Sequence, residues 1–237
     1  NMKLPTLHLL IVLFSLWVHG TSYAQVDSKK IDQLVEEAME KLDVVGVAIG
    51  IVKDGVIIHN KGYGLRSIET GGAVNKHTQF AIASNTKAFT TAALSILVDE
   101  GRLSWHDKVK DHIPEFKMYN EYVSENFNIQ DLLTHRSGLG LGAGDLMLFP
   151  DGSDFTIKDV VSGFQYFKPQ SAFRTKFDYD NLLYIVAGEV IAKVSGMSWE
   201  DFVKTRIMEP LDMDHSASSL AYLKNRRNLA TPHSNEM

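Results

Sequence analysis

The chain has 237 residues, of which 44% are hydrophobic and 22% are charged, and it contains no cysteine. A chain of this length and composition can bury a sizeable core, so we expect a folded globular protein. The net charge is -5, and no cluster of lysine and arginine exceeds a pair such as Arg226-Arg227, which argues against a nucleic-acid partner. Without cysteine the sequence has neither a disulfide framework nor a lipid-modified cysteine.

The first residues have the pattern of a cleavable signal peptide. Met2-Lys3 precedes an apolar run from Leu7 to Val18, and Ser22-Tyr23-Ala24 offers the small residues that signal peptidase reads. We therefore expect a signal peptide over 1–24, cleavage between Ala24 and Gln25, and a periplasmic or secreted protein. The apolar run is too short to span a bilayer, so we expect no stable membrane anchor after cleavage. A buried N-terminal helix of a cytosolic protein is the alternative.

Helix and strand patterns follow in turn. Apolar residues recur at helical spacing from Asp32 to Leu42, which predicts a surface helix. Two β-branched runs, Gly46 to Val52 and Val56 to Asn60, flank Lys53-Asp54-Gly55, and Asp-Gly between such runs predicts a hairpin over 45–61. Two strands alone do not make a stable sheet. Either later segments supply strands, or the chain is incomplete.

The rest of the chain is mainly helical. An apolar run, Phe80 to Ala83, indicates a strand leading into a strongly apolar helix that ends at Gly101. Few strand signals appear after it, and no linker divides residues 25–237. We expect an α+β fold with a helical region over 84–210. The other predicted helical segments are Ile129 to Thr134, Thr156 to Tyr166, Leu182 to Val194 and Trp199 to Met208.

Ser84 is the only serine in the chain with a lysine three residues later, Lys87, and it stands at the predicted start of the helix. Residues three apart lie on one helix face, so the amine of Lys87 can reach the serine hydroxyl. A serine needs a base to become a nucleophile, and Lys87 can serve only in its neutral form. A helix-capping serine beside a solvent-facing lysine is the alternative reading.

A second group could share the proton transfer. Tyr179-Asp180-Asn181 is the only Tyr-x-Asn in the sequence. A tyrosinate near a lysine can act as base toward serine and as acid toward the leaving group, and an asparagine can orient the lysine and a substrate amide. A buried tyrosine bonded to backbone is the alternative for Tyr179.

Three motifs, in this order, resemble the beta-lactamase-related serine hydrolases: Ser84 to Lys87, Leu132-Leu133-Thr134-His135-Arg136-Ser137-Gly138-Leu139, and Tyr179 to Asn181. That group includes class C beta-lactamases, penicillin-binding DD-peptidases, esterases and D-aminopeptidases, and the resemblance runs from about Ile31 to His233. It implies an α/β sandwich with an antiparallel sheet and a helical subdomain. It also implies Ser84 as acylated nucleophile, Lys87 as its activating partner, Tyr179 as general base and acid, and Asn181 as a substrate-orienting residue.

Two features depart from that family. Its Pro-Gly before the tyrosine motif is replaced around Ala172-Phe173-Arg174-Thr175, and its third motif, Lys-Thr-Gly or His-x-Gly on a late strand, is not found. Lys193-Val194-Ser195-Gly196 has the wrong spacing and His233-Ser234-Asn235 lacks the glycine. The missing strand would supply one oxyanion-hole amide, whose loss costs about 2.7 to 4 kcal/mol. We therefore expect that the sequence is truncated near Met237 and lacks the C-terminal strands.

Together these observations predict an exported serine hydrolase that acts through an acyl-enzyme on Ser84, with no metal and no cofactor. Beta-lactams, D-amino-acid peptides and small esters all remain open as substrates. A non-catalytic penicillin- or peptide-binding sensor and an inactive truncated copy are the alternatives. His135 could act as a base, but the matching family segment is structural, so we expect a loop histidine there. The oligomeric state is not encoded in any pattern we recognise.

Overall fold

A computed structural model describes residues 27–148, 154–223 and 226–234. The predicted signal peptide, 1–24, lies outside the described residues. The chain falls into two compact units, one containing residues up to 78 and from 228 onward, and the other spanning Gln79–Arg227. Helices and an antiparallel sheet are both present, so the fold is α+β as expected.

The first unit contains helix α2 (Ser28–Leu42) and a hairpin of strands β1 (Gly46–Lys53) and β2 (Val56–Gly64). The Asp27 side chain caps α2 by accepting a hydrogen bond from the Lys29 amide, so the helix begins earlier than the apolar pattern indicates. At the hairpin turn, Asp54 and Gly55 both have positive φ, 51° and 76°, as a tight two-residue connection requires.

A chain of hydrogen bonds fastens α2 to β2. The hydroxyl of Ser28 lies 2.9 Å from Nδ1 of His59, whose Nε2 lies 2.7 Å from the hydroxyl of Tyr63. Tyr63 in turn donates to Asp32 at 2.6 Å, and Lys61 pairs with the same carboxylate at 3.0 Å. Burial, and then the bond to Asp32, raise the pKa of Tyr63 to about 12, so this hydroxyl keeps its proton.

Within the described residues the sheet has two strands, in antiparallel register with Gly46 opposite Gly64. The segment after residue 227 returns to this unit, where Thr231 donates its amide to the carbonyl of Arg66. The ring of His233 accepts from the Ile68 amide at 3.1 Å. His233 therefore has a structural partner in this unit.

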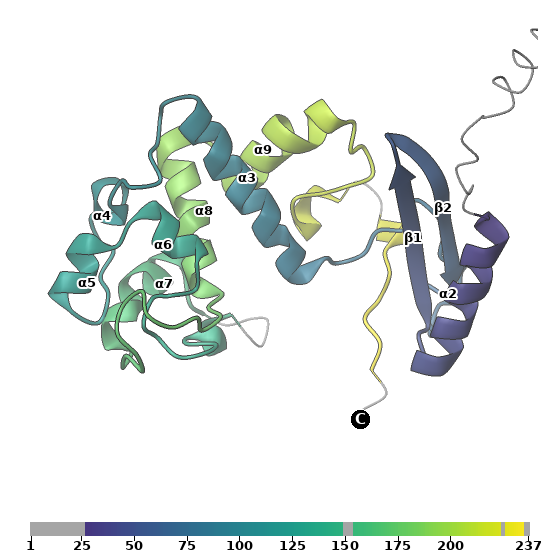
Figure 1. Cartoon of the computed structure of the whole chain (residues 1–237), viewed down its shortest axis with the longest axis horizontal. Helices are drawn as coiled ribbons and strands as arrows, with labels where there is room; N and C mark the ends of the chain where they lie inside the picture. The colour runs from purple at the N-terminus through teal and green to yellow at the C-terminus, as the bar shows by residue number, and fades with distance from the viewer. Residues whose placement is uncertain (1–26, 149–153, 224–225, 235–237) are drawn as a thin grey trace, which may run out of the picture. The chain divides into compact units, whose positions relative to one another are not determined.

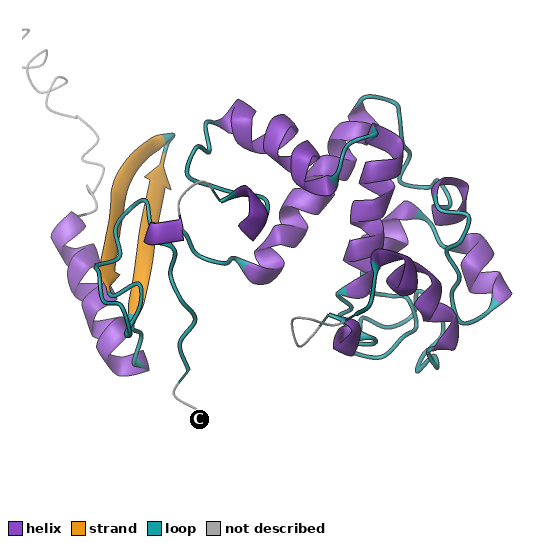
Figure 2. Ribbon diagram, turned by 180° about the vertical axis from the view of Figure 1, so that it is seen from behind, coloured by secondary structure: helices purple, strands orange, loops and turns teal. Residues whose placement is uncertain are grey.

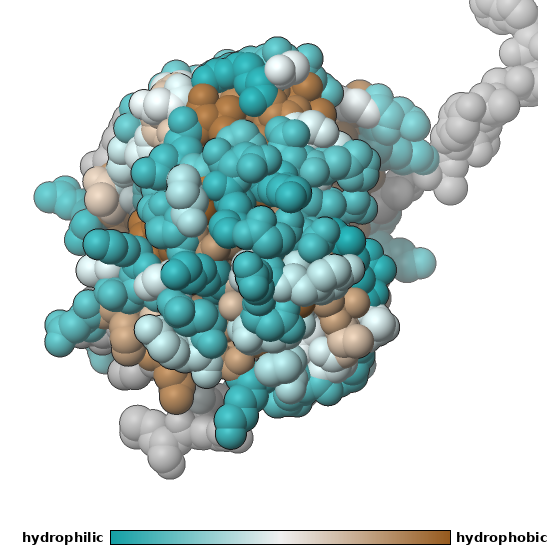
Figure 3. All heavy atoms as spheres, turned by 90° about the vertical axis from the view of Figure 1, so that its left-hand side faces the viewer, coloured by the Kyte–Doolittle hydropathy of each residue, from teal (hydrophilic) through white to brown (hydrophobic). Residues whose placement is uncertain are grey.

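The second unit is helical, and α3 packs against α8 in its interior, as both ribbon views show (Figures 1 and 2). Four fully buried phenylalanines anchor its core, and the ring of Phe116 lies 5.4 Å from that of Phe127 and 5.9 Å from that of Phe164. The face seen in Figure 3 is largely hydrophilic, in keeping with an apolar interior. The helices are α3 (Thr86–Asp99), α4 (Val109–His112), α5 (Glu121–Asn126), α6 (Ile129–Leu133), α7 (Ile157–Gly163), α8 (Leu182–Ser195) and α9 (Trp199–Val203).

Some local expectations were wrong. The apolar run Phe80 to Ala83 does not form a strand, because no neighbouring strand pairs with it in the part of the chain that is described; it is a loop that enters a 3-10 turn. The helix expected up to Met208 changes after Val203 into a π-helical turn, Lys204–Met208.

No single described helix has the length and apolar character needed to cross a membrane, although α8 joined to Trp199–Leu211 through a 76° bend meets both criteria.

Candidate active site

Ser84 occupies an exposed position at the entrance of α3. It lies in a 3-10 turn, Ala83–Asn85, that runs directly into the helix. The residue before it, Ala83, has φ +43°, in the left-handed region that side chains with a Cβ rarely adopt. The turn therefore presents the serine hydroxyl at the helix N-terminus with a sharp change of chain direction.

Lys87 lies in the first turn of α3, on the same face as Ser84. Its Nζ donates to Ser84 Oγ at 3.1 Å and to the side-chain oxygen of Asn181 at 2.7 Å. The same amine lies 4.7 Å from the ring centroid of Tyr179 and 5.3 Å from that of Tyr184. The ammonium group would thus be held by two oxygens and two aromatic faces.

Tyr179 comes from the extended segment that precedes α8. Its hydroxyl donates to Ser84 Oγ at 2.6 Å, so the serine oxygen is approached from two sides. Burial raises the pKa of Tyr179, but hydrogen bonds with Lys87 and Ser84 and the charge of Lys87 outweigh it, and the net pKa lies below the ordinary value of a tyrosine. Tyr179 therefore loses its proton at a lower pH than a free tyrosine does.

Asn181 stands at the start of α8 and links the lysine to a further acid. Its oxygen accepts from Lys87, while its Nδ2 donates to both carboxylate oxygens of Asp145, at 3.1 and 3.2 Å. The structure thus brings all four residues singled out from the sequence into one hydrogen-bonded group, although they come from segments 94 residues apart.

Sequence reasoning missed two supporting residues. Asp145 reads in the sequence as one loop acid among several, and only the fold brings it to Asn181. The residue between Tyr179 and Asn181, Asp180, is fully buried, and its Oδ1 accepts from the amides of Leu182 and Leu183 in the first turn of α8. Its other oxygen has no hydrogen-bond partner, and burial raises the pKa of Asp180 to about 7. An aspartate two residues before the apolar run that begins at Leu182 was the sequence signal that could have pointed to Asp180, because aspartate is common at helix N-termini.

A pocket of about 570 Å³ opens beside Ser84, and its lining includes Lys87 and Asn181. Apolar side chains from α7, α8 and α9, such as Ile157, Ile185 and Trp199, form much of the wall, and the lining also includes the polar residues Thr90, Glu189, Ser198 and Glu200. A pocket with mainly apolar walls and a small number of polar groups is the usual form of a small-molecule site.

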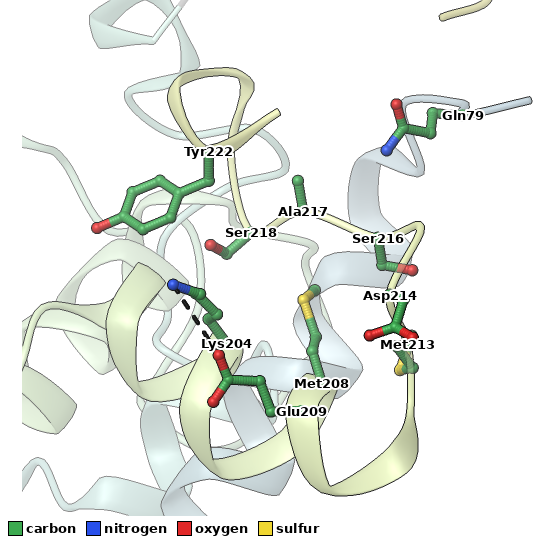
Figure 4. A pocket seen from close by; sticks show the side chains of 10 residues that line it. All are labelled: Gln79, Lys204, Met208, Glu209, Met213, Asp214, Ser216, Ala217, Ser218 and Tyr222. Atoms are coloured by element: carbon green, nitrogen blue, oxygen red, sulfur yellow. Dashed lines mark ion pairs between the residues drawn. The ribbon is translucent and has the colours of Figure 1, made fainter. Parts of the chain in front are cut away.

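A second, smaller pocket of about 80 Å³ lies beside the π-helical turn and shares no lining residue with the first (Figure 4). Lys204 and Glu209 form a 3.9 Å ion pair on its wall. None of the four predicted site residues reaches it. Across the described ranges, no three His, Asp or Glu side chains come close enough together to share a metal ion.

The beta-lactamase family model matches residues 31–236. The chain belongs to the beta-lactamase family. Among curated relatives, Protein flp of Staphylococcus aureus (strain N315) is 31% identical over 192 residues, which is 80% of this chain and 38% of the relative. The unguisins hydrolase ungD' of Aspergillus campestris is 31% identical over 197 residues, 79% of this chain and 36% of the relative. The chain thus spans less than two fifths of the length of these relatives.

Solved structures of this family have the same fold. The octameric penicillin-binding protein homologue from Pyrococcus abyssi superposes with a TM-score of 0.74 at 30% identity, over 86% of this chain and 47% of that one. FmtA from Staphylococcus aureus superposes with a TM-score of 0.70 at 25% identity, over 86% and 54% of the two chains. The beta-lactamase/transpeptidase-like fold expected from the motifs is therefore confirmed.

Proposed function

We propose that this protein is an exported serine hydrolase that cleaves an amide or ester through an acyl-enzyme on Ser84. The observation that carries the proposal is the convergence of Lys87 Nζ and Tyr179 OH on one serine oxygen, at 3.1 and 2.6 Å. A hydroxyl becomes nucleophilic when a positioned base takes its proton. Both candidate bases are within hydrogen-bond reach, which is the geometric requirement for that step.

The chemistry then follows in two halves. Ser84 Oγ forms a bond to the substrate carbonyl carbon as its proton passes to the phenolate of Tyr179, with Lys87 beside both oxygens. The bond from carbonyl carbon to the leaving nitrogen or oxygen breaks, and Tyr179 returns the proton to the leaving group. Water then attacks the acyl-enzyme by the same route in reverse, releasing an acid and the free serine.

The pocket beside Ser84 has room for the acyl group of a small-molecule substrate. Its volume of about 570 Å³ and its apolar walls fit the body of a beta-lactam, a D-amino-acid peptide or a small ester. Asn181 also lines this pocket, where its side chain can orient a substrate amide. The curated relative named as an unguisins hydrolase supports a hydrolytic activity.

Export is part of the proposal and rests on the N-terminal sequence pattern. Met2-Lys3, the apolar run and Ser22-Tyr23-Ala24 predict removal of residues 1–24. Mass determination of the mature N-terminus from the native host checks this: a protein that begins at Gln25 supports it, and one that retains residues 1–24 contradicts it.

Labelling with a fluorophosphonate probe tests the nucleophile. We expect one covalent adduct on the peptide that contains Ser84, loss of that adduct and of ester hydrolysis in Ser84→Ala, and neither loss in the exposed control Ser104→Ala. Hydrolysis that survives in Ser84→Ala would overturn the proposal. Fast labelling without turnover of any ester, amide or beta-lactam would instead identify the binding sensor.

A further inference from the structure

The carboxylate of Asp145 faces the amide of Asn181 and forms no hydrogen bond with Ser84 or Lys87. Both of its oxygens accept from Asn181 Nδ2, at 3.1 and 3.2 Å. On its other side the same amide accepts from Lys87 Nζ at 2.7 Å. Asn181 therefore stands between a cationic donor and an anionic acceptor.

This arrangement allows the amide only one orientation. Turning the Asn181 side chain over would bring its NH₂ against the amine of Lys87 and its oxygen against the carboxylate of Asp145. With Lys87 as an ammonium group and Asp145 as a carboxylate, the first contact would then join two donors and the second two acceptors, so neither could be a hydrogen bond. Without the charge on Asp145, Lys87 alone would set the orientation.

The loop that carries Asp145 is itself tied to the catalytic segment. The amide of Gly142 donates to the carbonyl of Tyr179 at 2.8 Å, and the amide of Asp145 donates to the carbonyl of Gly142 at 3.1 Å. Gly142 has φ +67°, and a Cβ there would lie 3.1 Å from the Asp145 carboxylate. A side chain at 142 would therefore be strained and would crowd the carboxylate, so the glycine permits both contacts.

We propose that Asp145 is a positioning residue that locks the Asn181 amide with its oxygen on Lys87, and so holds the lysine against Ser84. This inference rests on the proposed hydrolase function and deepens it. Asp145 acts through Asn181, whereas Ser84, Lys87 and Tyr179 meet the reacting atoms.

The negative charge of Asp145 also reaches Tyr179, which gives the proposal a readout beyond a loss of rate. It acts to raise the pKa of Tyr179, against the lowering by Lys87. The titratable groups around the Tyr179 side chain are Lys87 from α3, His135 from the loop after α6, Asp145 from the glycine-rich loop, and Asp180 and Tyr184 at the start of α8 and within it.

The test compares Asp145→Asn and Asp145→Glu with the charge-matched control Asp154→Asn, an exposed acid in the next loop. For hydrolysis of a p-nitrophenyl ester by the purified protein, we expect kcat/KM of Asp145→Asn to fall on the order of 10²-fold. Asp145→Glu keeps the charge and should recover part of that loss. Asp154→Asn should match the wild type. Circular dichroism melts establish that each variant is folded.

The pH profile separates positioning from simple support of the loop. Removing the charge lowers the pKa of Tyr179 further, so the acidic limb of kcat/KM against pH should move to lower pH in Asp145→Asn and stay in place in Asp145→Glu. A reduced rate with an unmoved limb would mean that Asp145 only scaffolds the loop, and would overturn the inference.

The inference and the proposed function fail in different ways. If Ser84→Ala abolishes turnover while Asp145→Asn equals the wild type in rate and pH profile, only the role of Asp145 is refuted. If Ser84→Ala retains full turnover, the hydrolase mechanism fails and the role of Asp145 fails with it.

Discussion

The imidazole of His135 lies stacked on the phenol ring of Tyr179, with centroids 4.4 Å apart and planes 29° apart. Its Nδ1 accepts a hydrogen bond from the backbone amide of Asp180 at 3.1 Å. Burial, and then the charge of Lys87, lower the pKa of His135, which favours the neutral ring. His135 therefore supports the ring of Tyr179 and the peptide group that follows it.

Replacing His135 with phenylalanine should keep a flat ring beside Tyr179 but leave the buried Asp180 amide without an acceptor. An unsatisfied buried donor costs about 1 to 3 kcal/mol of unfolding free energy, which urea titration can measure. His106→Phe, at an exposed loop position, is the matched control and should change stability by no more than about 0.5 kcal/mol. Equal stabilities of the two variants would show that the bond to Asp180 contributes nothing.

Tyr179→Phe removes only the hydroxyl and leaves the stack with His135 intact. If the phenolate is the base, kcat/KM should fall on the order of 10² to 10⁴-fold, with little change in melting temperature. In the wild type the rate should rise with pH through a tyrosine pKa below the ordinary value. Tyr166→Phe, which alters an exposed tyrosine, serves as the control. Activity within twofold of the wild type would remove Tyr179 from the chemistry.

The raised pKa of Asp180 leads us to expect a specific dependence of the unfolding free energy on pH. Burial raises its pKa from 3.8 to about 7 in the folded protein, so the folded state binds this proton more tightly than the unfolded state. The associated stability is complete below about pH 4 and is lost as the pH rises to about 7. The difference corresponds to roughly 4 kcal/mol.

Asp180→Asn should remove that loss, because an amide can still accept from the Leu182 backbone but does not titrate. The measurement is the difference in unfolding free energy between variant and wild type across pH 4 to 7, which cancels the other titrating groups. Asp154→Asn should show no such difference. A wild-type slope that persists in Asp180→Asn would contradict the assignment.

Arg174 lies in the segment that departs from the family pattern, and its contacts allow a test of that segment's contribution to stability. Its Nε and Nη2 donate to the two carboxylate oxygens of Asp131, at 2.9 and 2.6 Å, and the Asp131 side chain is only 5% exposed. Arg174→Ala should cost about 1 to 3 kcal/mol because it leaves a buried carboxylate with fewer partners. Lys176→Ala breaks an ion pair in which the lysine is 60% exposed, and should cost less than about 1 kcal/mol. Calorimetric melts of both variants distinguish the two cases.

Local patterns predicted the elements that have strong periodicity or clear turn residues. Asp54-Gly55 places the hairpin turn, although β2 continues to Gly64, beyond the β-branched run. The apolar helix after Leu182 agrees with α8 to within a residue at its end. The short helices α4 and α5 were missed, because four and six residues are too few to show a hydrophobic period.

The four site residues could be named from the sequence because each belongs to a short motif, and Ser84 and Lys87 are one helical turn apart. Asp145 could not, because a single acid in a glycine-rich loop has no local pattern that marks it. Its proposed role depends on a hydrogen bond between Gly142 and Tyr179, residues far apart in the chain, and contacts of that kind exist only in the folded molecule.

The left-handed backbone of Ala83, directly before Ser84, places a strained residue beside the proposed nucleophile. A residue with a Cβ in that conformation costs about 1 kcal/mol or more, and glycine there would avoid the cost. A glycine would also give the turn more backbone freedom, so the Ser84 hydroxyl would be held less firmly in one position. Selection for thermal stability should therefore favour Ala83→Gly, and the more stable variants should turn over substrate more slowly.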